Sequence, residues 1–220
     1  MIKSASLMRF SLNRLSKSHY RSNYRLFSIA KIDYNFSDGI GHLANANATC
    51  QVGGTFIHTA VCTKSIPLSE VSGSGLPLTI EYKIRAYAHG VIPGSIQRRE
   101  RHGSEEETLV SRIIDRSIRP VFAKGSNDQE IQITSTCHSI DKLFDPIVAA
   151  VNCASFALMK STLKFNGPIG CVRVGRVDDT FVLNPSEAQL ESSDLDLLVS
   201  GTADNVLMLV TSYHHYYSIY

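Results

Sequence analysis

The 220-residue chain is long enough for one domain with a sizeable core or for two small ones, and its 43% apolar and 19% charged residues are those of an ordinary globular protein. Its formal net charge of only +2 excludes binding of a polyanion through overall charge, so such binding would need a local cluster of cations. No apolar run approaches the roughly 20 residues needed to span a bilayer, and we expect no membrane span.

The first 32 residues differ from the rest in charge. They carry seven Lys or Arg and no Asp or Glu, whereas the remaining residues carry 15 basic and 20 acidic side chains. Basic residues interleaved with Leu and Phe in a Ser-rich, acid-free stretch are typical of a mitochondrial transit peptide. We predict a disordered transit peptide over residues 1–32, cleaved before Asp33, and a mitochondrial location, in the matrix or the intermembrane space. The alternative is a disordered basic arm that binds RNA or merely precedes the fold.

Turn and strand signals follow from residue 50 onward. Gly53-Gly54 separates two apolar runs and predicts a hairpin. Apolar residues on alternate and sometimes successive positions of both runs lead us to expect strands covered on both faces. A surface loop is expected over residues 66–76. The predicted strands of this half are Cys50–Val52, Phe56–Val61, Leu78–Tyr82 and a strand that starts near Ile131.

A helix is predicted after a cationic loop, in the stretch RRERHGSEEETLVSRIIDRSIRP. Ser104 has the position of an N-cap, and Glu107 completes a capping box. The helix should continue through Ile118, because Pro120 disfavours the helical conformation at Arg119. Its expected apolar face consists of Leu109, Val110, Ile113 and Ile114.

Cations of the same stretch form the candidate binding site. Three of them precede the helix in a loop, and three lie on one face of it at spacings i, i+4 and i+7. An arginine-bearing loop that leads into an arginine-striped helix suits a polyanion. The alternative for the helical arginines is a solvated face of weak ion pairs with neighbouring carboxylates. The candidate polyanion-binding residues are Arg98, Arg99, His102, Arg112, Arg116 and Arg119.

The second half of the chain predicts a second helix, a hairpin and two further strands. Asp145-Pro146 supplies an N-cap and an N1 proline for a small-residue helix that should end near Ser161. The other predicted elements are strands at Ile169–Val174 and Thr180–Leu183 about the turn Asp178-Asp179, a short helix at Ser186–Ser192, and strands at Asp194–Ser200 and Val206–Val210. The fold class is therefore α+β, with helices packed on a mixed β-sheet.

The five cysteines stand singly, without the spacing of a zinc site. All five lie in apolar strand or helix contexts. We therefore expect them to be small core residues in a reducing compartment.

Several stretches resemble a known family in one consistent order: GHLANANATCQVGGTFIHTAV, IPGSIQRRE, SEEETLVSRIIDRSIRPVF, FNGPIGCVRVG, FVLNPS and LDLLVSGTADNVLM. They are similar to the first RNase PH-type domain of polynucleotide phosphorylase, most of all to its mitochondrial form. The resemblance implies an RNase PH-like domain over residues 33–208 and an atypical C-terminal tail over residues 209–220. It also leads us to expect a fragment or a truncated gene product, because family members are about three times longer.

The activity implied by the resemblance is 3′–5′ phosphorolysis of RNA, in which inorganic phosphate is the co-substrate and magnesium assists. The residues of this chain depart from that chemistry. At the helix start where active domains bind phosphate, Asp145 would repel an anion and Pro146 lacks an N–H donor. Asp194 matches one catalytic acid, but Ala188 stands where a second is needed. We therefore expect no catalytic residue and no metal ligand in this chain, and no activity of the chain alone.

The resemblance further implies single-stranded RNA as a partner and a homotrimeric ring for the full-length family. The family arginines that match Arg98 and Arg99 grip RNA at the mouth of a central channel. Aromatic residues that precede them in the family are replaced here by Ile96-Gln97. Two alternatives remain: a catalytically inert RNase PH-like ring subunit that binds RNA or acts as a scaffold, and an unstable fragment without activity.

Overall fold

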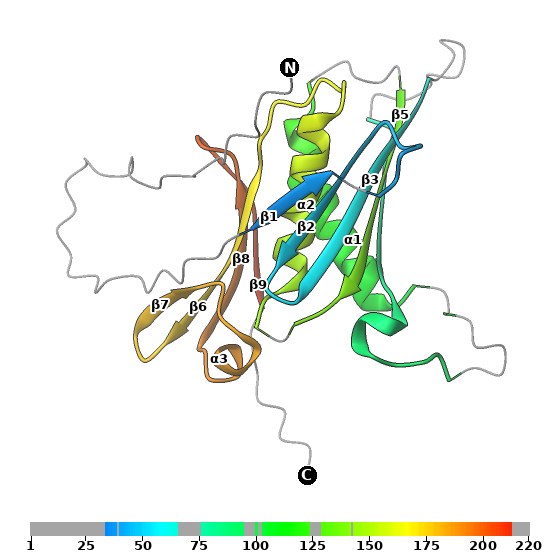
Figure 1. The fold of residues 1–220 in the computed structure, drawn as a ribbon. Coiled ribbons are helices and arrows are strands. Elements are labelled where there is room, and N and C mark those ends of the chain that lie inside the picture. The colour runs from blue at the N-terminus through cyan, green and yellow to red at the C-terminus, as the bar shows by residue number, and fades with distance from the viewer. Residues whose placement is uncertain are drawn as a thin grey trace, which may run out of the picture.

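The computed structural model describes residues 34–38, 40–65, 76–94, 100, 103–123, 129–141 and 143–212. Within these ranges the chain forms two β-sheets with two long helices between them (Figure 1). The α+β class and the mixed sheet with packed helices, both predicted from the sequence, are confirmed.

The first sheet has five strands in the order β1-β2-β3-β5-β4. All neighbouring strands are antiparallel except β4 and β5, which are parallel and make the sheet mixed. Gly53, with φ of 56°, forms the predicted turn between β2 and β3. The predicted loop at 66–76 lies outside the described residues, apart from Leu76. The strands are β1 (Asn35–Asp38), β2 (Ala46–Val52), β3 (Thr55–Ser65), β4 (Leu78–Ile84) and β5 (Gln129–Ser139).

The second sheet has four antiparallel strands in the order β7-β6-β8-β9. Asp178 and Asp179 have φ of 48° and 58° and form the predicted hairpin turn. The last strand runs to Ser212, so the first residues of the predicted tail belong to the sheet, and residues 213–220 lie outside the described part. The elements are β6 (Gly170–Val177), β7 (Thr180–Leu183), the short helix α3 (Glu187–Glu191), β8 (Leu195–Gly201) and β9 (Val206–Ser212).

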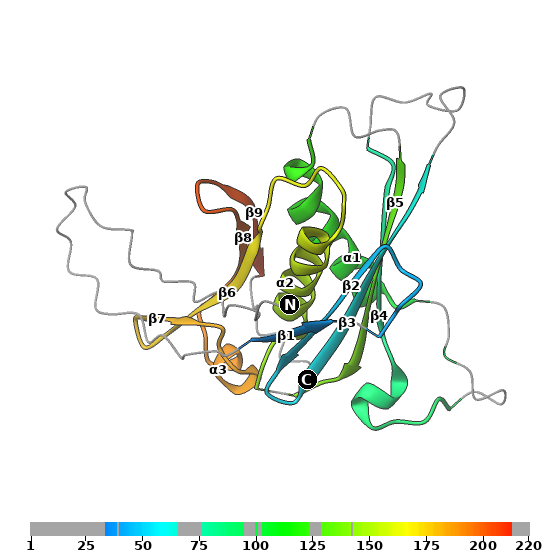
Figure 2. The same cartoon turned by 45° about the horizontal axis from the view of Figure 1, so that its top comes forward.

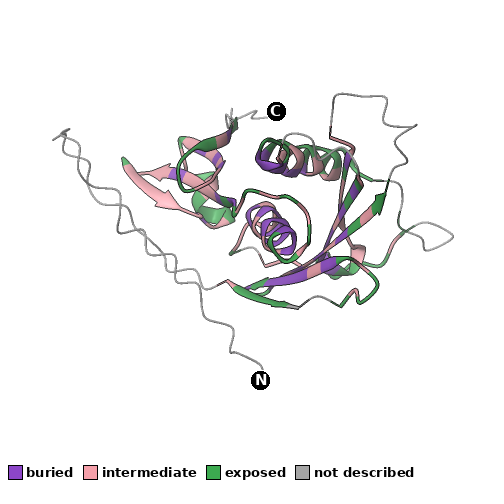
Figure 3. Cartoon of the chain, turned by 90° about the horizontal axis from the view of Figure 1, so that it is seen from above, coloured by how far each residue is buried: buried purple, intermediate pink, exposed green. Residues whose placement is uncertain are grey.

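Helices α1 (Glu105–Ile118) and α2 (Pro146–Lys160) fill the space between the sheets (Figures 2 and 3). Helix α2 packs against β2 and β3 on one side and β6 on the other, while α1 packs against β4 and β9. The small side chains that predicted close packing of α2 are all buried: Ala149, Ala150, Cys153, Ala154 and Ala157. Within this core the hydroxyl of Ser200, on β8, donates a hydrogen bond of 2.8 Å to the hydroxyl of Ser117, on α1.

Both ends of α1 are as predicted, but the conformation of Arg119 is not. Ser104 Oγ accepts a hydrogen bond from Glu107 N, and the Glu107 carboxylate accepts one from Ser104 N, which completes the capping box. Helix α1 ends at Ile118, but Arg119 keeps helical dihedral angles and begins the 3-10 helix η2 (Arg119–Val121). The expectation that Pro120 removes Arg119 from the helical region was therefore wrong. Side-chain hydrogen bonds of Arg119, described below, stabilise its helical conformation, which Pro120 disfavours.

Three further expectations need correction. Leu109, expected on the apolar face of α1, is 58% exposed, because Val110 and Ile114 take the buried positions. Cys62 is exposed, whereas the other four cysteines are buried as predicted. Strand β3 is not covered on both faces: its residues alternate between buried and partly exposed, and no described element packs on its outer face.

No helix in the described ranges is long and apolar enough to cross a membrane.

Candidate nucleic-acid interface

Of the arginine-bearing stretch over residues 98–102, the structure describes Glu100. Arg98, Arg99 and His102 lie outside the described residues, so their predicted role stays a prediction. Glu100, in the same loop, is described, and its carboxylate accepts hydrogen bonds from Ala86 N at 2.8 Å and from Arg85 Nη1 at 2.6 Å. The bond from Ala86 N, followed by that from Arg85, lowers the pKa of Glu100. Glu100 is therefore fixed beside the 3-10 helix η1 (Ala86–His89), just after β4.

The two arginines of α1, Arg112 and Arg116, and Arg119 just after it have different environments. Arg119 donates to both carboxylate oxygens of Asp115, at 3.0 and 2.6 Å, and to the carbonyl oxygens of Leu76 and Leu78, at 2.8 and 3.1 Å. Its guanidinium thus ties the end of α1 to the start of β4. Arg112 and Arg116 are exposed, and neither forms an ion pair with any residue that the structure describes. Only these two arginines of the helix are available to a ligand.

The N-terminus of α2 carries its own anion. Asp145 caps the helix by accepting a hydrogen bond from Ile147 N at 2.7 Å, and Pro146 supplies no N–H. Arg173 of β6 donates from Nη1 to Asp145 at 2.8 Å and from Nε and Nη2 to Asp196 at 2.7 and 2.6 Å. The side chains of Asp145 and Asp196 are 6% and 9% exposed, so this Asp145–Arg173–Asp196 triad is largely removed from solvent.

The triad blocks the position at which the N-terminus of α2 would otherwise attract phosphate. A helix N-terminus binds anions through free N–H groups and the positive end of its dipole. Here the Asp145 carboxylate occupies that end, and Arg173 is neutralised by two carboxylates, with the hydrogen bond to Asp196 as the main cause of its raised pKa. Sequence reasoning identified Asp145 but missed Arg173 and Asp196, although a lone Asp among the apolar residues of β8 was a usable signal.

The two positions that the sequence analysis compared with catalytic acids are Asp194 and Ala188. Asp194 is 72% exposed on its side chain and lies 3.6 Å from Arg176 Nη2. Ala188 is part of α3 and offers no ligand. Among the described residues no cluster of three or more His, Cys, Asp or Glu side chains could hold a metal ion. Since Asp145 and Asp196 are already bound by Arg173, the described donors do not fit a magnesium ion.

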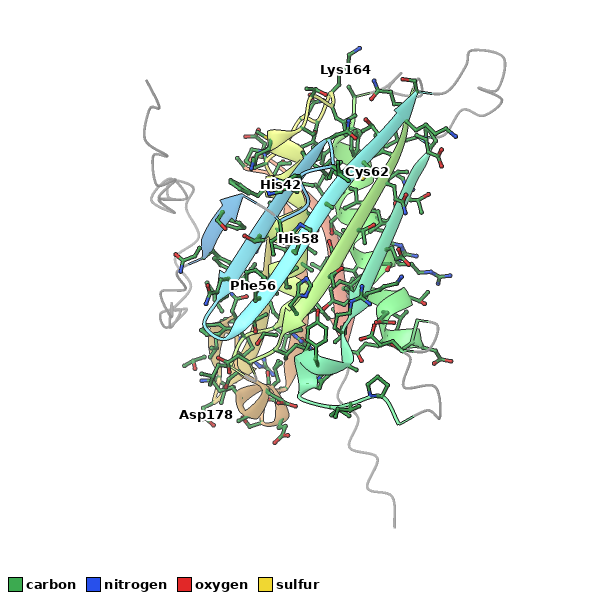
Figure 4. The ribbon with its side chains drawn as sticks, turned by 45° about the vertical axis from the view of Figure 1, so that its right-hand side comes forward. His42, Phe56, His58, Cys62, Lys164 and Asp178 are labelled. Carbon is green, nitrogen blue, oxygen red and sulfur yellow. The ribbon has the colours of Figure 1, made fainter. Side chains whose placement is uncertain are left out.

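Four aromatic rings that sequence reasoning missed gather on the outer face of the first sheet. We call them the ring cluster: Phe56 and His58 of β3, His138 of β5 and Tyr87 of η1. The rings of Phe56, His58 and Tyr87 have their centroids 5.9, 6.4 and 6.0 Å from that of His138. Figure 4 shows Phe56 and His58 on this face of β3. Desolvation lowers the pKa of both histidines, with a further contribution to each from a neighbouring positive group, His138 for His58 and Arg85 for His138.

Two family descriptions match the chain. Residues 33–164 match the 3′ exoribonuclease family, domain 1, and residues 167–215 match the 3′ exoribonuclease family, domain 2. The boundary between the matches falls between α2 and β6, where the chain passes to the second sheet.

Two relatives that are similar in sequence are polyribonucleotide nucleotidyltransferases. The chain is 44% identical over 178 residues to that of Nitratidesulfovibrio vulgaris, covering 79% of this chain and 23% of the relative. It is 42% identical over 191 residues to that of Acinetobacter baylyi, covering 84% of this chain and 27% of the relative. The resemblance to polynucleotide phosphorylase is thus confirmed, and the chain spans about a quarter of the length of these relatives.

Two solved structures share the fold of this chain. The Archaeoglobus fulgidus exosome with RNA bound to the active site has a chain that matches with a TM-score of 0.65 at 16% identity, over 84% of this chain and 79% of that one. Rice (Oryza sativa) Rrp46 matches with a TM-score of 0.64 at 12% identity, over 83% of this chain and 81% of that one. With both family domains matched along most of its length, the chain belongs to the 3′ exoribonuclease family and has the RNase PH-like fold.

Proposed function

We propose that this chain is the RNA-binding first core of a mitochondrial polyribonucleotide nucleotidyltransferase, which degrades RNA from its 3′ end by phosphorolysis. The names of the relatives support the family activity. One observation carries the division of labour: the Asp145–Arg173–Asp196 triad fills the helix terminus that would bind phosphate. Phosphorolysis then takes place on another part of the complete enzyme, such as a second core.

The chemistry needs groups that neutralise the attacking phosphate and the leaving nucleoside diphosphate. Magnesium, when bound in the complete enzyme, supplies part of that neutralisation. The described donors of this chain do not fit it, so this core supplies no catalytic step. Its contribution is to hold single-stranded RNA, with Arg98, Arg99 and His102 before α1 and Arg112 and Arg116 on the exposed face of α1. Arg119 contributes by fixing that helix to β4.

The RNA-binding role is tested by charge removal. The double substitution Arg98→Ala with Arg99→Ala is expected to weaken binding of a labelled poly(A) oligonucleotide, and to reduce the slope of log affinity against log salt by about one per lost phosphate contact. The control Arg176→Ala removes one positive charge on the second sheet, from an exposed ion pair with Asp194, and should leave the slope unchanged. An unchanged affinity and slope in the loop variant would discard the role.

A second candidate function is a catalytically inert ring subunit that only binds RNA or scaffolds a complex. It is favoured by the same triad together with the fold shared with exosome chains. A fusion of this chain to the second core of a polyribonucleotide nucleotidyltransferase separates the two. The fusion should have phosphorolytic activity under the first proposal and should be inactive under the second.

The location follows from the leader. Residues 1–32 would direct the chain to mitochondria and be cleaved before Asp33. The complete enzyme would assemble as a homotrimer. Mass spectrometry of the protein isolated from mitochondria should find an N-terminus near Asp33, and a mature chain that begins at Met1 or Ile2 would refute the transit peptide.

A further inference from the structure

We propose that the ring cluster, Phe56, His58, Tyr87 and His138, is a stacking platform for the bases of single-stranded RNA. This site rests on the proposed RNA-binding function and adds a base-contacting surface to the cationic one. It would supply the aromatic stacking that the loop lacks at Ile96-Gln97.

The platform lies on the sheet face that the two long helices do not cover. Helices α1 and α2 cover the inner face of the first sheet (Figures 3 and 4). On the outer face, η1 lies against β5 and Gly41 lies beside the His58 ring, so Tyr87 is the most accessible ring of the cluster. Phe56 and His58 alternate with the buried Thr55, Ile57 and Thr59 along β3, which directs them outward.

An irregularity in the sheet presents the central ring. Phe56 pairs with Ser139 and Ile57 pairs with Cys137, so His138 has no partner residue on β3. Such a bulge re-aims a side chain, and bulges are common beside functional sites. Tyr87 Oη and His138 Nδ1 then form a hydrogen bond of 2.6 Å, which fixes the two rings at an interplanar angle of 22°. Tyr87 remains 57% exposed, so its ring has a free surface.

The rings are uncharged at neutral pH. Burial lowers the pKa of His58 and His138 below the usual value for histidine, so both imidazoles are neutral at pH 7. His58 Nε2 is buried and has no hydrogen-bond partner among the described residues. Neutral rings stack on the flat faces of any base, which gives binding without sequence preference.

Cations next to the rings provide for the sugar-phosphate backbone. Arg85 links β4 to η1, and its guanidinium is 39% exposed in its pair with Glu100. Lys83, on the outer face of β4, is 42% exposed in a pair with Glu81. Exposed pairs of this kind contribute little stability and can exchange a carboxylate for a phosphate at small cost. Rings beside exchangeable cations are the two components of single-strand binding sites.

The surroundings favour RNA over a protein partner. Outward positions beside the cluster carry Thr49, Gln132, Thr134 and Thr136 rather than a continuous apolar patch. Thr49 and Thr136 are buried, so of these four side chains Gln132 and Thr134 are open to a ligand. The fully buried centre of a protein interface is more apolar than this.

The test combines a protein variant with a ligand variant. Binding of a poly(A) oligonucleotide and of an abasic oligonucleotide of equal length is measured by fluorescence anisotropy for the full chain and for Tyr87→Ala. Loss of a stacked base should weaken poly(A) binding roughly five- to hundredfold. It should leave binding of the abasic strand unchanged. The control Tyr87→Phe keeps the ring and should stay within about twofold of the unaltered protein for both ligands.

Each outcome separates the two proposals. If the unaltered protein binds neither strand, the RNA-binding function fails. If it binds poly(A), and Tyr87→Ala weakens both strands equally or neither, the platform fails and the RNA-binding function stands.

A second readout reports contact directly. The chain contains no tryptophan, so Tyr87→Trp introduces a single tryptophan at the proposed site, and its emission can be followed selectively. Poly(A) should quench its emission along the same binding curve as the anisotropy, whereas the abasic strand should not. The matched control Leu209→Trp, at a residue that is 58% exposed on the second sheet, should show no quenching. Equal quenching at both positions, or none at Trp in place of Tyr87, would overturn the platform.

Discussion

Replacing Arg173 by methionine should destabilise the fold far more than the same change at Arg176. Arg173 makes three hydrogen bonds of 2.6 to 2.8 Å to two carboxylates that are 6% and 9% exposed. Removing one partner of a buried ion pair costs about 3–5 kcal/mol, because the remaining charge is left without compensation. Arg173 itself is 21% exposed, so we expect the lower end, about 3 kcal/mol, and a fall in Tm of roughly 6–12 °C.

Equilibrium urea unfolding at pH 7, followed by far-ultraviolet circular dichroism, measures the difference. Arg176→Met is the control in the same strand, since its pair with Asp194 is long and exposed and should contribute less than about 1 kcal/mol. Equal costs for the two variants would refute the triad as a buried, mutually neutralised unit.

Other predictions concern thiols, arginines and the helix cap. At pH 8 one thiol, Cys62, should react rapidly with a chromogenic disulfide reagent, because it is exposed, whereas burial raises the pKa of Cys171 to about 12 and of Cys153 to about 11. A second rapidly reacting thiol would contradict this prediction. In denaturant all five thiols should react. Arg119→Ala should cost about 1–2 kcal/mol in urea unfolding through its lost bonds to β4, whereas Arg116→Ala should cost less than about 0.5 kcal/mol yet lower the salt slope of RNA binding. The reverse order of stabilities would show that the wrong arginine was assigned to the fold. Ser104→Ala should cost about 1 kcal/mol, and a loss below the error of the measurement would argue that the capping box does not hold in solution.

Local signals in the sequence predicted most of the elements, because each depends on a few neighbouring residues. Ser104 with Glu107, and Asp145 with Pro146, define helix starts through bonds within one turn. Asp178-Asp179 defines a hairpin through the conformations that Asp tolerates. In each case the interaction that decides the structure spans at most three residues.

Features that join distant segments were not predicted. Arg173 meets Asp145 across 28 residues and Asp196 across 23, and only the pairing of β6 with β8 and the packing of α2 bring them together. The ring cluster likewise joins Tyr87 to His138 across 51 residues. Leu109 and Cys62 were misplaced because an apolar residue beside a buried one is not itself buried when the element is covered on one side only.

The measurement that tests the central claim most directly is phosphate-dependent decay of RNA by the purified full chain. Labelled poly(A), magnesium and inorganic phosphate are supplied, and ADP release is followed together with RNA binding, beside a full-length polyribonucleotide nucleotidyltransferase as a positive control. The triad at the start of α2 predicts RNA binding without ADP release. Release of ADP that depends on phosphate would contradict the account, and would show that this core degrades RNA despite the carboxylate at its helix terminus.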